Sequence, residues 1–117
     1  MSKVLEFETY RERMNKRILD AKSKIFNRIY NVDAQTYHAG ALDAKTKELI
    51  GLSSSLVLRC DDCVKYHILE SLKNGATLEE ITETFEISLV IGGSIVIPHL
   101  RRAFEFLDEA IALIPHK

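Results

Sequence analysis

The chain has 117 residues, and its 16 basic and 17 acidic side chains leave a formal net charge of −1 at pH 7. This balance gives no overall electrostatic attraction to nucleic acid or to anionic lipid, so neither is expected as a partner. The length suits a single domain over residues 1–117, with a core that needs no disulfide. The N-terminus soon becomes polar, and the longest charge-free run, residues 87–98, is too short to span a bilayer. We therefore expect a cytoplasmic protein without a membrane partner.

The N-terminal third predicts one long surface helix followed by a connection. Apolar residues recur among many charges between residues 4 and 30, which favours a helix with a sparse apolar face. Residues 31–42 show no clear period and contain Gly40, so we expect them to connect this helix to the next. Asp43 is suited to be an N-cap, and it predicts a second helix through residues 44–58.

Three further helices are predicted in the rest of the chain. A third helix begins near Cys60 and ends at Lys73, before an Asn-Gly pair that is typical of helix termination. A capping-box pattern, Thr77 with Glu80, begins a fourth helix over residues 77–91. A Gly-Gly pair either interrupts that helix or lets another helix approach closely, and a proline suits the first turn of a last helix through residues 99–113. The pattern predicts an all-α fold.

The segment RCDDCVKYH, residues 59–67, contains both cysteines of the chain. Cys60, Cys63 and His67 share one face if the segment is helical, because positions three, four and seven apart lie on one stripe. A helix N-terminus favours the thiolate, which attacks a peroxide or a disulfide, and the second thiol then closes a disulfide. His67 is close enough in sequence to accept or relay the thiol proton. In the cytosol such a pair is more often catalytic or metal-binding than structural.

The residues alone leave three interpretations open. The dithiol could perform redox chemistry, the three side chains could bind a metal ion, or they could simply pack. Zinc would need a fourth ligand or an open catalytic position, and the chain has no second C-x-x-C to supply one. Asp61 and Asp62 lie in the first turn, where their charge opposes a thiolate.

Several other polar residues receive no catalytic role from the pattern around them. Glu48, in a helix with several charges, is interpreted as a solvated residue. His99 follows Pro98 and is interpreted as a solvated residue at a helix start, with a position lining a pocket as the alternative. Arg101-Arg102 is interpreted as a solvated face, with a subunit contact as the second interpretation.

Residues 42–97 resemble the alkylhydroperoxidase-D-like branch of the carboxymuconolactone decarboxylase family. The family pattern places a glutamate twelve residues before a C-x-x-C and a histidine four residues after the second cysteine. Glu48, Cys60, Cys63 and His67 match all four positions. The segment NGATLEEI and the later Gly-Gly pair also occur at the expected distances.

The resemblance implies a helical fold in which Glu48 reaches the dithiol from the preceding helix. Twelve residues of straight helix would separate these groups by about 18 Å, so a bend or break is expected near residues 58–60. It also implies a thiol-dependent peroxidase or dithiol oxidoreductase that reduces a hydroperoxide through a Cys60–Cys63 cycle. Glu48 and His67 would relay the proton, no bound cofactor would be needed, and an external thiol protein would supply electrons. The family likeness favours Cys63 as the attacking thiol, whereas the helix-end argument favours Cys60.

The chain departs from the family at one position near the dithiol. The best-known family peroxidase has a histidine between its cysteines where this chain has Asp62. A carboxylate there raises a neighbouring thiol pKa, so peroxide turnover would be slower or the substrate would be a disulfide. The lactone decarboxylases of the family generally act without the cysteine pair, so that activity is not expected.

The family likeness also leads us to expect a homotrimer or homohexamer. Burial between subunits is expected along the charge-free segment of residues 87–97. The alternative functions are a metal-binding or structural helical oligomer, and a disulfide-directed oxidoreductase without peroxidase activity.

Overall fold

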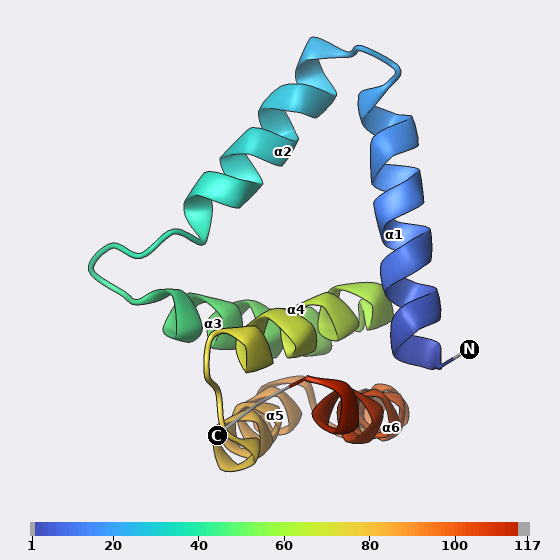
Figure 1. The fold of residues 1–117 in the computed structure, drawn as a ribbon. Helices are drawn as coiled ribbons and strands as arrows, with labels where there is room; N and C mark the ends of the chain where they lie inside the picture. Colours follow the sequence, from blue (N-terminus) through green and yellow to red (C-terminus); the bar gives the residue numbers. More distant parts are fainter. Residues whose placement is uncertain (1, 115–117) are drawn as a thin grey trace. The chain divides into compact units, whose positions relative to one another are not determined.

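The computed structural model describes residues 2–114, which form six α-helices and one short 3-10 helix (Figure 1). The elements are α1 (Lys3–Leu19), α2 (Lys24–Thr36), α3 (Ala44–Val57), α4 (Asp61–Lys73), α5 (Leu78–Gly92), η1 (Ser94–Val96) and α6 (Ile97–Leu113). The predicted all-α fold is confirmed. Within the described residues no helix is long and apolar enough to cross a bilayer. The predicted domain of residues 1–117 also includes residues 1 and 115–117, which lie outside the described residues.

The chain divides into two compact units, one ending at His38 and the other beginning at Ala39. In the first unit the prediction of a single long helix over residues 4–30 is wrong, because the chain turns between α1 and α2. Lys22 has a positive φ of 57°, and the Ser23 side chain caps α2 by accepting a hydrogen bond from the Phe26 N–H. The predicted connection over residues 31–42 is also too long, since α2 continues to Thr36.

The second unit contains α3 to α6, whose apolar faces form its core (Figure 1). Helix α3 packs against α4 and α5, and α4 packs against α6. Buried residues recur four positions apart on each helix, as expected for one face turned inward. The large residues of this core are Leu52, Leu56, Ile68, Leu72, Ile81, Phe85, Phe106 and Leu107.

Helix ends in the second unit follow the predicted capping signals. Asp43 accepts a hydrogen bond from the Thr46 N–H at 2.8 Å and begins α3. Thr77 and Glu80 form both bonds of a capping box at the start of α5. Helix α4 ends at Lys73 with Asn74 as its C-cap, followed by Gly75 at a φ of 88°, and a proline occupies the first turn of α6. The sequence therefore predicted these four helices closely.

Candidate active site

The turn between α3 and α4 is the local feature that positions the dithiol. Helix α3 ends at Val57, Arg59 adopts a left-handed φ of 61°, and Cys60 is the N-cap of α4. The Arg59 N–H donates to the Leu56 carbonyl and the Cys60 N–H to the Ser55 carbonyl, each at 3.0 Å, which is the Schellman pattern of hydrogen bonds. The break expected near residues 58–60 is confirmed, and it folds α4 back against α3.

Cys60 and Cys63 are joined by a disulfide at the N-terminus of α4, with their Cα atoms 5.2 Å apart. The Cys63 N–H points at the Cys60 Sγ, which it approaches at 3.3 Å in the position of a capping acceptor. The two sulfurs differ in environment, because Cys63 is exposed and Cys60 is half-buried. A negative charge on Cys60 would be stabilised by the helix N-terminus, while Cys63 is the more accessible of the two.

A buried carboxylate–imidazole pair lies one helical turn from the dithiol. Glu48 of α3 and His67 of α4 are 4% and 8% exposed, and the His67 Nδ1 lies 2.8 Å from the Glu48 Oε1. A carboxylate accepts hydrogen bonds, so Nδ1–H donates, and a proton exchanged with a thiol must pass through Nε2. His67 follows Cys63 by four residues on α4, which puts both on one face. Glu48 is therefore not the solvated residue that its own surroundings in the sequence indicated.

The metal-binding interpretation finds no support in the arrangement of side chains. Across residues 2–114, no group of three or more His, Cys, Asp or Glu side chains is arranged to hold a metal ion. Cys60 and Cys63 are bonded to each other, and the Nδ1 of His67 is engaged by Glu48.

A second charged cluster is centred on Asp61, the residue after Cys60, and the sequence did not predict it. Asp61, the first residue of α4, accepts a hydrogen bond from the His99 Nδ1 at 2.8 Å and one from the Arg102 Nε at 2.9 Å, both from α6. Partial burial raises the pKa of Asp61, but these two hydrogen bonds and the nearby positive charge outweigh it and lower the pKa. The interpretation of His99 as a solvated residue is wrong, because its side chain is half-buried, whereas Arg102 is exposed as predicted and also pairs with Asp61. Only Pro98, which predicted a helix start beside His99, gave a signal for this region.

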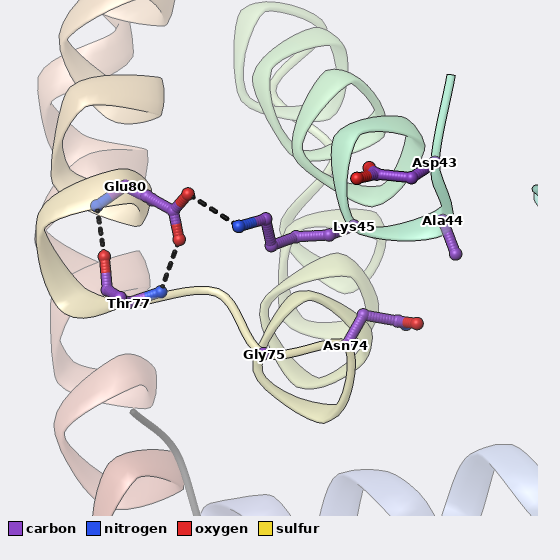
Figure 2. A pocket seen from close by; sticks show the side chains of 7 residues that line it. All are labelled: Asp43, Ala44, Lys45, Asn74, Gly75, Thr77 and Glu80. Carbon is purple, nitrogen blue, oxygen red and sulfur yellow. Dashed lines mark hydrogen bonds and ion pairs between the residues drawn. The ribbon is translucent and has the colours of Figure 1, made fainter. Parts of the chain in front are cut away.

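A polar pocket of about 550 Å³ lies at the other end of the α3–α4 pair (Figure 2). Its main interaction is an ion pair between Lys45 and Glu80, whose Nζ and Oε2 atoms are 2.8 Å apart. Thirteen residues of α4 correspond to about 20 Å, so this pocket is remote from the disulfide. The pocket is lined by Asp43, Ala44, Lys45, Asn74, Gly75, Thr77 and Glu80.

Comparison with known proteins places this arrangement in a family. The sequence profile of the carboxymuconolactone decarboxylase family matches residues 23–106, which include the turn, the dithiol and the glutamate–histidine pair. The chain belongs to the carboxymuconolactone decarboxylase family. A solved family member from Thermotoga maritima, TM1620, is 47% identical over 92% of each chain, with a TM-score of 0.88. A role in the antioxidative response has been suggested for that protein.

Two other family comparisons are less informative about chemistry. A carboxymuconolactone decarboxylase family protein of Legionella pneumophila has a TM-score of 0.73 at 24% identity, covering 90% of this chain and 96% of its own, and shows the shared fold alone. An uncharacterized protein of Cupriavidus necator is 33% identical over 69 residues, which is 59% of this chain. The chain spans 61% of the length of that relative.

Proposed function

We propose that this protein belongs to the alkylhydroperoxidase-D-like branch of the family and acts as a thiol-dependent peroxidase. The observation that carries the proposal is the Cys60–Cys63 disulfide at a helix N-terminus, with the buried Glu48–His67 pair one turn away. A dithiol, a histidine base and a carboxylate that orients the histidine are the groups that such chemistry requires. The likeness to the Thermotoga maritima protein, for which an antioxidative role has been suggested, supports the same function.

In the oxidative half of the cycle, the exposed Cys63 attacks the hydroperoxide as a thiolate after His67 accepts its proton. The new S–O bond forms as the O–O bond breaks, and the departing alkoxide takes a proton to become an alcohol. The Cys60 thiolate then attacks the sulfenic acid on Cys63, which forms the disulfide and releases water. Glu48 stabilises the positive charge that the imidazole carries between these steps.

In the reductive half, two electrons from an external thiol protein return the disulfide to the dithiol. No bound organic cofactor takes part, because sulfur carries both electrons. We propose the cytoplasm as the site of action, since its thiol pool is kept reduced and can regenerate the enzyme.

The first experiment is peroxide treatment of the reduced protein, with no metal present, followed by thiol alkylation and intact-mass analysis. We expect rapid loss of both free thiols and a mass lower by two hydrogen atoms, as an intramolecular disulfide forms. The Cys60→Ser variant should stop at a sulfenic acid on Cys63, which a cyclic 1,3-diketone would trap, whereas Cys63→Ser should react slowly. Thiols that survive for minutes would remove peroxide as a substrate. Oxidation by small disulfides would then support the disulfide-directed alternative, for which the exposed Asp62 beside the dithiol is the specific reason.

We also propose that copies of the chain associate through the apolar segment that begins in α5. Val90 is 85% exposed, and the neighbouring Ile87, Ile91 and Ile95 are also exposed. A contiguous apolar surface of this kind is typical of an interface, and its match to the segment predicted for subunit burial favours a second copy as the occupant. Sedimentation should give a trimer or hexamer that Val90→Lys weakens. A monomeric wild-type protein would contradict this proposal.

A further inference from the structure

The cluster of Asp61, His99 and Arg102, which begins at the residue after Cys60, has no role in the cycle described above. Asp61 follows Cys60 directly and ties α4 to α6 through His99 and Arg102. The Arg102 Nη2 also lies 3.1 Å from the His99 Nδ1. Since Nδ1 already donates its proton to the Asp61 carboxylate, that last approach is a close contact between donors and not a second hydrogen bond. Asp61 is therefore the residue to which both His99 and Arg102 bind.

The negative and positive charges of this cluster would act in opposite directions on the sulfur of Cys60, the residue that precedes Asp61 at the start of α4. A carboxylate next to Cys60 disfavours the thiolate, while a cation close by favours it. Arg102 supplies a guanidinium cation and binds the Asp61 Oδ2 directly. The lowered pKa of Asp61 agrees with a carboxylate that is charged and compensated by these partners. His99 holds the other carboxylate oxygen and so fixes the direction in which Asp61 points.

We propose that Arg102, with His99, is a positioning residue that acts through Asp61 to set how readily Cys60 leaves as a thiolate when the disulfide is reduced. The inference rests on the proposed dithiol cycle. In the step concerned, an external thiolate attacks the exposed Cys63 Sγ and forms a mixed disulfide. The Cys60–Cys63 bond breaks, its electron pair passes to Cys60, and a better-stabilised thiolate leaves faster.

The other charged groups of this region are the same in wild type and variants, so their effect on the Cys60 thiolate cancels when the variants are compared. Arg59 precedes Cys60 at the turn, and the exposed Asp62 and the half-buried Lys65 lie on α4. The Glu48–His67 pair from α3 and α4 lies one turn beyond Cys63. Arg101 is the neighbour of Arg102 in the first turns of α6, is also exposed, and is the matched control for loss of one positive charge.

The test isolates Cys60 in a Cys63→Ser background, which keeps the backbone N–H that points at the Cys60 sulfur. The rate of alkylation by iodoacetamide, measured against pH, reports the thiolate fraction. Arg102→Ala should move the midpoint of this profile to higher pH and slow the reaction at pH 7 by about threefold to tenfold, less than direct ion pairing would give because solvent screens the site. The rates should converge at high pH, where every thiol is ionised.

The companion variants make the inference refutable even if Arg102→Ala loosens the fold. Asp61→Asn should move the midpoint in the opposite direction, Arg102→Lys should restore most of the wild-type profile, and Arg101→Ala should leave it unchanged. A merely structural role would move Asp61→Asn and Arg102→Ala the same way, and that result, or no movement in either, overturns the proposal. With both cysteines present, dithiothreitol should reduce the Arg102→Ala disulfide more slowly than the wild type, again by about threefold to tenfold. None of these measurements uses peroxide, so they remain informative if the peroxidase proposal fails.

Discussion

Replacing Glu48 by alanine and by glutamine separates the hydrogen bond of the buried pair from its charge. Alanine removes the acceptor that His67 Nδ1–H uses inside the unit, where both side chains are almost fully buried. Loss of a buried hydrogen-bond partner costs about 1–3 kcal/mol, and the space left by the side chain adds to it, so we expect the free energy of unfolding to fall by about 2–4 kcal/mol. Glutamine keeps an acceptor oxygen and removes a buried charge, so its stability should stay within about 1 kcal/mol of the wild type.

The two Glu48 variants should differ in stability but lose the same amount of reactivity with peroxide. Both variants lose the carboxylate that stabilises a protonated His67, so both should oxidise with peroxide roughly 100-fold more slowly, within the range of 10²–10⁴ for general acid–base catalysis. The assay combines urea unfolding of the reduced protein, at one fixed protein concentration, with the rate of thiol loss under peroxide. Glu83→Gln, an exposed change on α5, controls for the loss of one negative charge. A Glu48→Gln variant that oxidises at the wild-type rate would refute the proton relay, and equal stability of the two variants would refute the energetic reasoning.

Three further changes test the local physical arguments. Arg59→Gly should raise the free energy of unfolding by about 0.5–1 kcal/mol in urea titrations, because glycine relieves left-handed strain and offsets only part of that gain through its entropy. Gly92→Ala should lower it by about 1–3 kcal/mol, because the new Cβ would lie 2.5 Å from the Cγ2 of the fully buried Val96, and an unchanged urea midpoint would contradict this. The hydrogen bond from Lys45 lowers the pKa of Glu80, so the ion pair stabilises the fold above the ordinary glutamate pKa and loses its effect as the pH falls through the folded-state pKa. The difference in urea midpoint between wild type and Lys45→Met should therefore be present at pH 7 and vanish in strong acid; a difference that persists there would contradict the assignment.

The fold was predictable where helix ends carry explicit chemical signals. Asp43, Thr77 with Glu80, and Gly75 each satisfy backbone groups locally, and the helix boundaries nearby agree with the prediction. The break between α1 and α2 has no glycine or proline, and Lys22 takes the left-handed conformation instead. Ser23 was the only signal there, because a serine before an apolar pair can cap a helix. A single weak cap could not outweigh a continuous pattern of charges and apolar residues.

In the candidate site, too, contacts between residues close in sequence were predictable, whereas contacts made by helix packing were not. Cys63 and His67 lie on one face of α4 because of their helical spacing, which the sequence alone predicts, and Cys60 is the N-cap of the same helix. Glu48 lies 19 residues from His67, and only the family resemblance predicted that it approaches the dithiol from the preceding helix. The bonds from His99 and Arg102 to Asp61 join residues 38 and 41 positions apart, through the packing of α6 on α4. No local periodicity encodes that packing, so the bonds to Asp61 were not predicted and His99 was interpreted as solvated.

The presence of Asp61 beside the dithiol makes sense only when both halves of the proposed cycle are considered. As a leaving group Cys60 benefits from a low pKa, but as the nucleophile that closes the disulfide it loses intrinsic reactivity as its pKa falls, so the best compromise lies near the ambient pH. The helix N-terminus and Arg102 push towards the thiolate, whereas Asp61 opposes them, and the direct bond between Arg102 and Asp61 keeps the two effects close to balance. At high pH, where the Cys60 thiol is fully ionised with or without the substitution, Asp61→Asn should therefore speed reduction of the disulfide by small thiols while slowing its closure after peroxide attack. Because a simple loss of structure would slow both steps, opposite changes in the two rates would identify charge balance at Cys60 as the function of the cluster.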